Sequence, residues 1–395
     1  MLSDAQRSTL AATLPAVQDA LADITQRFYR GMFTAHPELH DDLFNRTHQK
    51  SGEQPQALAG SIAAFARLQL EPDARRQRFI LDRIAHKHAS LGVTRDQYTV
   101  VHEHLFAAIV EVLGDAVTPP VADAWDQLYW DMADLLIASE ADLYARAGVT
   151  PGQVWHDALV TERAQISPDT IALTLTDPEP NTSLPGFRPG QYISVQVPLA
   201  DGAHQIRQYS LTGTPDSPRW QFSVKLAGEV SAYLHEQVFE GDLLHVSMPF
   251  GDLVLPDDDL PLTLASAGIG CTPVIGLLTA MAARGDERPV TVLHADRSRD
   301  RQPHRGQLAA LVESLPQGRL YQWYEKASSH VLSDAVRTGQ MALDDVAIDP
   351  RTHVMLCGPT GFLSSMRDEF LARDIAAERI HYETFGPELL RSGAR

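Results

Sequence analysis

The stretch LTLASAGIGCTP, residues 262–273, decides the fold of the C-terminal part of the chain. Its apolar half, 262–267, has the length of a buried strand, and the glycines that follow allow a sharp turn close to a bound group. Pro273 suits the first turn of a helix, where its missing N–H leaves no hydrogen bond unmade. A strand, a glycine loop and a helix in this order predict an anion site at the helix start. Pro273 stands where the G-x-G-x-x-G fingerprint has its last glycine, so an ordinary tight turn is the alternative.

The same pattern continues towards the C-terminus, where short apolar runs alternate with helical periodicity. This alternation predicts a parallel sheet with helices on both faces. The predicted strands are 262–267, 290–294, 320–324, 353–357 and 380–384, and the predicted helices are 274–283, 308–315 and 362–372.

A second glycine loop, CGPTG at residues 357–361, follows the fourth predicted strand. Ligands of open α/β sheets bind outside the carboxyl ends of the strands, so we expect both loops at one edge of the sheet. Taken alone, Cys357 is better explained as a small buried core residue. Two glycine loops at matching positions favour a nucleotide site. Its predicted contacts are Gly268, Gly270, Cys271, Thr272, Pro273, Cys357, Gly358 and Pro359.

Residues 154–256 have a hydrophobic period of two, with turn dipeptides such as Pro189-Gly190 between the runs. Short strands at this spacing predict a small antiparallel barrel. Within it, Arg207 can hold a pyrophosphate through a fork of hydrogen bonds. The ring of Tyr209 can stack on a flat ring system, and the hydroxyl of Ser210 can reach a ring heteroatom. A plain edge strand is the alternative explanation of this motif.

A further phosphate cradle is predicted at the segment GEVSAYL, residues 228–234. Gly228 and Ser231 are expected just ahead of a short helix, whose free N–H groups attract an anion. Val230 lies between them and belongs to the same predicted site. A capped helix start without a ligand is the alternative.

Residues 4–146 show helical periodicity and predict an all-helical domain. His88 lies on the apolar stripe of its helix, four residues beyond Ile84. A neutral imidazole on an apolar wall is typical of haem ligation in a helical fold. Tyr98 and Glu140 also occupy core positions, and a His, a Tyr and a Glu that face inward would satisfy one another. Three separately satisfied residues are the alternative.

The composition narrows the class of protein. The 395 residues carry a net charge of −18 with a pI near 5.2, which argues against binding to nucleic acid or to an anionic membrane surface. No apolar run approaches the roughly 20 residues that span a bilayer. Only Cys271 and Cys357 occur, which excludes a disulfide framework and fits a reducing compartment. With no secretory leader in sight, we expect a soluble cytoplasmic multidomain protein without a membrane anchor.

Several motifs together resemble the flavohaemoglobin family. In the helical part these are FYRGMF at 28–33, HPEL at 36–39 and IAHKH at 84–88. RQYS at 207–210 resembles the family's flavin motif, and YETFGP at 382–387 resembles its C-terminal motif. The resemblance covers nearly the whole chain. It implies a globin joined to a ferredoxin-reductase-like unit that binds FAD and NAD(P)H.

The resemblance also implies roles for individual residues. His88 would be the haem iron ligand, with Tyr98 and Glu140 as its hydrogen-bonding partners, while Tyr29 and Gln54 would be the distal polar residues. The other implied haem contacts are Phe44 and Leu58, and the other contacts assigned to the reductase cofactors are Tyr192, Arg207, Gln208, Tyr209, Ser210, Gly228, Val230, Ser231, Glu383 and Phe385.

The implied organisation is a globin haem domain at 1–147, an FAD-binding β-barrel domain at 148–257 and an NAD(P)-binding α/β domain at 258–395. The implied activity is that of a nitric oxide dioxygenase with haem b, FAD and NAD(P)H. The nucleotide reduces FAD, FAD reduces the haem, and the reduced haem with dioxygen converts nitric oxide to nitrate. The partners are therefore nitric oxide and dioxygen, and no obligate protein partner is implied.

Two other functions stay open at this stage. One is an NAD(P)H-dependent haem or flavin reductase with another acceptor, such as a peroxide or ferric iron, and the other is a haem-based gas sensor. A sensor needs an output module, and this chain has a reductase in that place. Cys271 and Thr384 depart from the family pattern, which leaves the placement of the nicotinamide open.

The choice of nucleotide depends on the end of the second predicted strand of the sheet. Asp296 at this position favours the free 2′-hydroxyl of NADH. Arg297 or Arg299 could instead hold the 2′-phosphate of NADPH. From the sequence we expect NADH.

Overall fold

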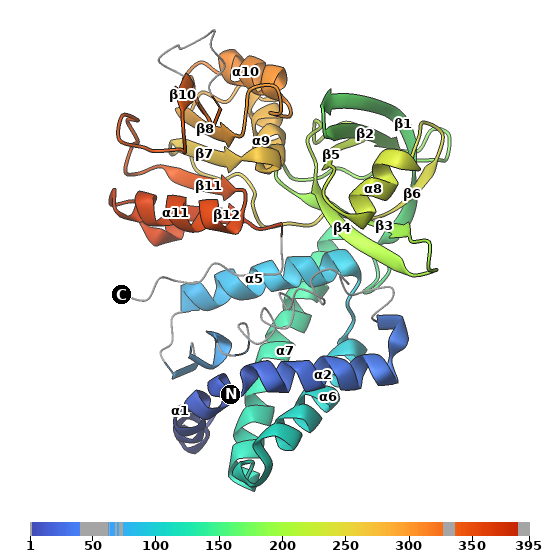
Figure 1. Cartoon of the computed structure of the whole chain (residues 1–395), viewed down its shortest axis with the longest axis vertical. Coiled ribbons are helices and arrows are strands. Elements are labelled where there is room, and N and C mark those ends of the chain that lie inside the picture. The colour runs from blue at the N-terminus through green and yellow to red at the C-terminus, as the bar shows by residue number, and fades with distance from the viewer. Residues whose placement is uncertain are drawn as a thin grey trace. The chain divides into compact units, whose positions relative to one another are not determined.

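The computed structural model describes residues 2–39, 62, 64–67, 69–70, 74–326 and 336–385. The chain divides into two compact units, one formed by residues 1–155 with 198–206 and the other by 156–197 with 207–386. The helices of the first unit and the two sheets of the second are labelled in Figure 1. Each unit is described by itself.

The first unit is helical, as the periodicity predicted. Its longer described helices are α1 (Asp4–Asp19), α2 (Leu21–Ala35), α5 (Ala74–Leu91), α6 (Arg95–Leu113) and α7 (Pro119–Ala147). Helices α1 and α5 pack on α7, and α2 packs on α6. Helix α1 ends and α2 begins at Ala20, and Val17 of α1 is buried, as are Ile24 and Phe28 of α2.

Local chemistry sets the ends of these helices. Ser3 and Gln6 form a reciprocal capping box at the start of α1. The backbone N–H of Thr94 donates to the side chain of Gln97 at 2.9 Å and begins α6 in a similar way. Helix α7 begins with two prolines, whose missing N–H groups cost nothing in a first turn. It ends at Ala147, where Gly148 takes up the left-handed conformation that commonly terminates helices.

The second unit contains an antiparallel sheet, which confirms the predicted strands between residues 154 and 256. Its strands are β1 (Trp155–Ser167), β2 (Thr170–Thr176), β3 (Tyr192–Pro198), β4 (His204–Ser210), β5 (Trp220–Lys225) and β6 (Leu243–Ser247). Their order is β4-β3-β6-β1-β2-β5. A bridge between Leu211 and Phe222 links the end of β4 to β5, so the two outer strands meet as in a barrel. Helix α8 (Glu229–Glu236) follows β5.

The second sheet is fully parallel, with the order β10-β9-β8-β7-β11-β12. Its strands are β7 (Leu262–Ala267), β8 (Val290–Asp296), β9 (Gly318–Tyr324), β10 (Val336–Thr338), β11 (His353–Cys357) and β12 (Ile380–Glu383). Its helices are α9 (Cys271–Ala283), α10 (Arg305–Ser314) and α11 (Thr360–Leu371). The sequence did not predict β10, because three residues with one apolar side chain carry no detectable period.

The strand order of this sheet fixes where a ligand fits. From β7 the chain proceeds through β8 and β9 to one side, and β11 and β12 lie on the other side of β7. Right-handed crossovers therefore place α11 on the opposite face from α9 and α10 (Figure 1). The order reverses between β7 and β11, and a crevice forms outside the carboxyl ends of such a strand pair. The fold class is as predicted, while the exact domain boundaries at 147 and 257 remain a prediction.

Candidate functional site

The helical unit brings together the three polar residues that its apolar stripes contain. His88 comes from α5, Tyr98 from α6 and Glu140 from α7. The Nδ1 atom of His88 lies 2.9 Å from Oε1 of Glu140 and 2.9 Å from the hydroxyl of Tyr98. The Tyr98 hydroxyl donates to the same Oε1 at 2.5 Å. The hypothesis of one shared network is confirmed, and that of three separate residues is not.

The electrostatics of this network fix its protons. Burial, together with the charge and hydrogen bond of Glu140, raises the pKa of the Tyr98 hydroxyl far above its usual value. Tyr98 therefore stays protonated and donates. Glu140 is 3% exposed, and a buried carboxylate requires such donors. It accepts one hydrogen bond from Tyr98 and can accept a second from His88 Nδ1–H.

This arrangement leaves the opposite edge of the imidazole for a ligand. With Nδ1 committed to Glu140, Nε2 lies on the far side of the ring, and the His88 side chain keeps 32% of its surface exposed. A neutral imidazole whose second nitrogen donates to a carboxylate is a strong donor to a metal ion. The donor set thus fits haem iron, which a helical unit of this kind would hold through Nε2.

Two tyrosines of α7 hold backbone carbonyls next to this network by hydrogen bonds, and the sequence analysis did not identify them. The Tyr129 hydroxyl donates to the backbone carbonyl of Tyr98 at 2.6 Å, and the Tyr144 hydroxyl donates to that of Val93 at 2.7 Å. The second bond holds the turn that directly follows α5. A tyrosine on an apolar stripe looks like an ordinary core residue, so the sequence carried no signal for this role.

The predicted distal side of the haem site is only partly described. Gln54, Phe44 and Leu58 lie outside the described residues. Tyr29 on α2 is buried, with its ring 4.6 Å from that of Phe28 and 5.5 Å from that of Phe33.

The barrel presents the RQYS motif on β4. Burial lowers the pKa of the Arg207 guanidinium, while Tyr209 and Glu229 act in the opposite direction. A cation held out of water next to a helix start is suited to an anionic group. The Tyr209 ring lies 5.2 Å from that of Phe222, which fixes its plane against β5. These two side chains fit the pyrophosphate and the ring system of a flavin.

The other two residues of the motif lie on the opposite face of β4 from Arg207 and Tyr209. Side chains alternate along a strand, so Gln208 and Ser210 project to the other face of β4. The Gln208 amide donates to the hydroxyl of Ser194 on β3 at 2.9 Å, and Ser210 is buried. Tyr192 begins β3 and pairs with Phe250 through two backbone hydrogen bonds of 2.7 and 2.9 Å. The flavin contacts assigned to Gln208, Ser210 and Tyr192 remain predictions.

The start of α8 has the geometry of a phosphate cradle. The Ser231 hydroxyl accepts from the backbone N–H groups of Ala227 and Gly228, both at 2.8 Å, and so orders the turn before the helix. Ser231 lies inside the first turn of the helix, whereas the sequence analysis expected it just ahead of the helix. A Cβ atom built on Gly228 meets nothing within 4 Å, so open space borders the turn. Val230 is buried beneath it.

The two glycine loops of the parallel sheet meet, as predicted. Cys357 at the end of β11 stands beside Ser266 of β7 in register. A Cβ atom on Gly270 would lie 2.3 Å from the carbonyl oxygen of Cys357, so only glycine allows the loops to approach this closely. Gly268 has a φ of +56°, which glycine adopts without strain. The two loops therefore meet at the point where the strand order reverses, which is where ligands of open α/β sheets bind.

The residues of the two loops are largely buried. Gly270, Cys271, Thr272 and Pro273 are buried at the start of α9, and Gly358 is buried as well, while Pro359 is exposed. Burial raises the pKa of the Cys271 thiol to about 12, with the charge of Asp296 acting in the same direction. Cys271 therefore stays a thiol and serves as a small core residue. Glu383 ends β12 in a buried position beside Cys357, and Phe385 is 47% exposed.

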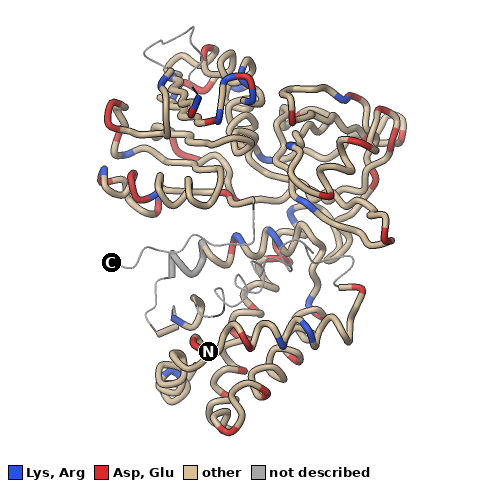
Figure 2. The backbone as a smooth tube through the Cα atoms, in the orientation of Figure 1, with Lys and Arg blue, Asp and Glu red and all other residues tan. Residues whose placement is uncertain are grey.

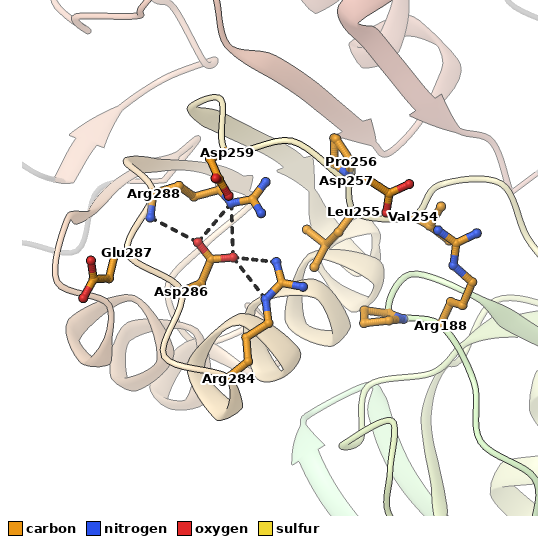
Figure 3. A pocket seen from close by; sticks show the side chains of 11 residues that line it. Arg188, Val254, Leu255, Pro256, Asp257, Asp259, Arg284, Asp286, Glu287 and Arg288 are labelled. Atoms are coloured by element: carbon orange, nitrogen blue, oxygen red, sulfur yellow. Dashed lines mark hydrogen bonds and ion pairs between the residues drawn. The ribbon is translucent and has the colours of Figure 1, made fainter.

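A second pocket lies at the opposite edge of the parallel sheet, where the strands begin. It has a volume of about 540 Å³ and includes residues that precede β7 and β8 (Figure 3). Asp286 accepts from Arg284 at 2.5 and 3.1 Å and from Arg288 at 3.0 and 3.1 Å. Burial alone would raise the pKa of Asp286, but these hydrogen bonds outweigh it and lower that pKa. The sequence analysis did not predict this cluster of loop residues.

Comparison with known proteins agrees with each of these regions. Three family models match: Globin over residues 26–136, Oxidoreductase FAD-binding domain over 157–254 and Oxidoreductase NAD-binding domain over 264–368. The chain is 38% identical to the flavohemoprotein of Chromobacterium violaceum and 36% identical to that of Deinococcus radiodurans, over 98% of each chain.

Solved structures give the same result. The chain is similar to a crystal structure of flavohemoglobin from Malassezia yamatoensis with bound FAD and heme. The TM-score is 0.90 at 34% identity, and the match covers 98% of this chain and 100% of that one. A second match is the FAD/NAD binding domain of nitric oxide dioxygenase from Vibrio cholerae, with a TM-score of 0.55 and 30% identity, over 60% of this chain and all of that one. Among the described helices, we find none that is both long and apolar enough to span a membrane.

Proposed function

The chain belongs to the flavohemoprotein family, and we propose that it is a nitric oxide dioxygenase that uses haem, FAD and a pyridine nucleotide. The observation that carries the proposal is the hydrogen-bonded network of His88, Tyr98 and Glu140, in a chain whose two glycine loops meet where the strand order reverses. Once bound, the cofactors supply hydride acceptance, single-electron transfer and the activation of dioxygen that turns nitric oxide into nitrate.

The residues of the helical unit set the properties of the haem site. His88 would hold the haem iron through Nε2, while Glu140 accepts a hydrogen bond from its Nδ1–H and so increases electron donation from the ring. Tyr98 orients the carboxylate by donating to it. A small apolar cavity of about 30 Å³, lined by α1, α2, α6 and α7 among others, lies in the same unit and suits small apolar gases such as nitric oxide and dioxygen.

Tyr29 is proposed to act on the oxygen side of the site. Its hydroxyl would donate a hydrogen bond to the dioxygen substrate, on which negative charge develops during the reaction. Gln54 is proposed to share this role.

The residues of the second unit bind and orient the other two cofactors. Arg207 and the start of α8 hold the pyrophosphate of FAD, and Tyr209 stacks on its ring system. The loops at Gly268–Gly270 and Cys357–Pro359 hold the nucleotide next to it. Glu383 and Phe385 are proposed to lie at the flavin. A cytoplasmic location belongs to the same proposal, and the two free cysteines support it.

The test compares the amounts of nitric oxide and dioxygen that are consumed with the amount of nitrate that is formed. Purified protein loaded with haem and FAD is mixed with the nucleotide, dioxygen and nitric oxide, and we expect one nitrate for each nitric oxide and each dioxygen consumed. A protein that reduces ferric iron or peroxide faster than it consumes nitric oxide would be a reductase with another acceptor, and the proposal would fail. Ligand-dependent structural change without turnover would identify a gas sensor.

The Tyr29→Phe variant tests the oxygen side. A hydrogen bond to a charged group is worth roughly 1.5–3 kcal/mol, so its loss should weaken oxygen binding about ten- to a hundredfold. Most of this change should appear as faster release of oxygen, measured by flash photolysis. Carbon monoxide is less polar when bound and serves as the control ligand on the same sample. Equal effects on both gases would show that Tyr29 only shapes the pocket.

A further inference from the structure

The segment that leaves β8 lies at the position where a dinucleotide-binding sheet reads the ribose of the adenosine half. Asp296, the last residue of β8, stands opposite Tyr324, the last residue of β9. The backbone N–H groups of Glu325 and Lys326 donate to the carbonyls of Asp296 and Arg297 at 3.2 and 3.0 Å. The two segments therefore leave the sheet together and form one rim of the nucleotide site.

Asp296, whose carboxylate would bind a ribose 2′-hydroxyl, has its side chain buried at the end of β8. The Asp296 side chain is only 3% exposed. Its Oδ1 accepts from the backbone N–H of Arg297 at 2.6 Å, and its Oδ2 lies 3.8 Å from Nε2 of His294. That separation is too long for a hydrogen bond, and Oδ2 has no partner in the described part of the chain. In this position Asp296 does not present its charge to the outside of the site.

Arginines occupy the outside of the same rim. Arg297 and Arg305 are exposed, and Arg299 is half-buried. Within the described residues, none of these three forms an ion pair with a carboxylate. Arg301 is different, because its guanidinium lies 3.4 Å from Asp169 of the barrel. In Figure 2, blue positions recur along the chain where it enters α10.

Two of these arginines act on the end of β9. Burial raises the pKa of the Tyr324 hydroxyl, and the charges of Arg305 and Arg299 work against that rise, so both lie within electrostatic reach of Tyr324. Arg305 is also the first residue of α10, where free N–H groups and the helix dipole attract an anion.

A buried donor stands in the same place. Gln302 is 3% exposed, and its Oε1 accepts from the Tyr324 hydroxyl at 2.5 Å and from Gln322 at 3.0 Å. Its Nε2 is buried and has no partner in the described part of the chain. The outside of the rim therefore presents the arginine cations, which is the chemistry of a phosphate site, while Gln302 holds Tyr324 from the buried side.

We propose that Arg299 and Arg305, with Arg297 beside them, bind the 2′-phosphate of NADPH, so that the enzyme prefers NADPH to NADH. The inference rests on the proposed function to the extent that the chain takes hydride from a pyridine nucleotide. It replaces the preference for NADH that the sequence favoured, because that preference needed Asp296 to face the ribose. A phosphate carries close to two negative charges, and a guanidinium binds two of its oxygens at once.

The experiment compares the two nucleotides on the holoenzyme without any gas substrate. Anaerobic reduction of the flavin is followed by its absorbance, and kcat/KM is obtained for NADPH and for NADH. We expect the ratio of NADPH to NADH to exceed ten. Replacement of Arg299 or Arg305 by Ala should lower that ratio about ten- to a hundredfold, with the NADH value unchanged. The matched control is Arg301→Ala, which removes an arginine already paired with Asp169 and should leave the ratio as it is.

Binding of 2′,5′-ADP and of 5′-AMP, measured by calorimetry, gives a readout that needs no turnover. The wild type should bind 2′,5′-ADP more tightly, and Arg299→Ala should remove the difference. A nucleotide ratio of one or less, or a ratio that neither variant changes, overturns the inference. If the ratio behaves as expected but no nitrate is formed from nitric oxide, the proposed function fails and the nucleotide preference stands.

Discussion

The haem region and the nucleotide rim differ in whether their buried polar groups have hydrogen-bond partners. Around His88, the Tyr98 hydroxyl and the Glu140 carboxylate satisfy each other at 2.5–2.9 Å. At the ends of β8 and β9, Asp296 Oδ2 and His294 Nε2 lie 3.8 Å apart, and neither they nor Gln302 Nε2 has a hydrogen-bond partner in the described chain. A buried polar group without a partner costs about 1–3 kcal/mol. The polar groups of the first region are thus satisfied by side chains of this chain, whereas the second region keeps buried polar atoms that lack a hydrogen-bond partner in the described chain.

The largest effect should come from removing His88, the residue at the centre of the network with Tyr98 and Glu140. His88→Ala takes away the atom that binds iron, so we expect complete loss of the haem Soret band. FAD should remain at full occupancy, because its contacts belong to the other unit. The matched control is His86→Ala on the same helix, which should keep its haem. If the His88 variant retained a normal Soret band, another histidine would have to be the ligand.

The next largest effect is expected from removing the carboxylate of Asp286, which is hydrogen-bonded to both Arg284 and Arg288. Asp286 and Arg288 side chains are both 6% exposed, so Asp286→Ala leaves a buried cation unpaired. Such a loss costs about 3–5 kcal/mol, which denaturant unfolding at pH 7 would measure. Asp259→Ala removes an exposed charge from the same pocket and should change stability by less than about 0.5 kcal/mol.

The pH dependence of this cluster follows from the lowered pKa of Asp286. Because the folded pKa lies below the unfolded one, the contribution of Asp286 is complete above the unfolded value, near 3.9, and is lost as the pH falls through the folded value. The difference in stability between wild type and Asp286→Ala should therefore shrink on acidification. A difference that stays constant down to pH 2 would contradict this account.

A smaller effect is expected where the two glycine loops meet. Gly270→Ala places a Cβ atom 2.3 Å from the Cys357 carbonyl oxygen, and overpacking of this kind costs about 1–3 kcal/mol. The displaced loop should also slow flavin reduction by the nucleotide, measured by stopped flow, while the haem spectrum stays unchanged. Gly186→Ala, whose Cβ would have an ordinary contact of 3.7 Å, is the control. Unchanged flavin reduction in the Gly270 variant would place the nucleotide elsewhere.

The mildest change is Glu140→Gln, which keeps the shape of the network and removes its charge. Haem and FAD should stay bound, and turnover should fall on the order of tenfold, as for other partners of a metal-bound imidazole. The iron–histidine stretching frequency and the haem reduction potential should both shift, since the ring donates less electron density. Asp142→Asn, an exposed change on the same helix, should shift neither. No shift in the Glu140 variant would make this carboxylate purely structural.

The contrast between the two regions also explains what the sequence could predict. His88, Tyr98 and Glu140 stand out because each interrupts a regular apolar stripe, and their helices bring the stripes together. The glycine loops stand out because each follows an apolar run. No pattern in the sequence indicates that Asp296 is buried, because the orientation of its side chain depends on His294 and on the backbone of Arg297. The same holds for Asp286, whose partners lie in a loop without any period.

The close approach of Gly270 to Cys357 has a consequence for mutational tolerance. In a library that randomises one codon at a time and selects for reduction of the flavin, position 270 should return glycine alone. Position 268, where a Cβ would meet nothing within 4 Å but φ is +56°, should also admit Asn and Asp. Position 228, whose extended backbone has a φ of 171° and open space beside it, should accept small side chains generally. Three glycines that look alike in the sequence would thus differ in how many alleles each one permits.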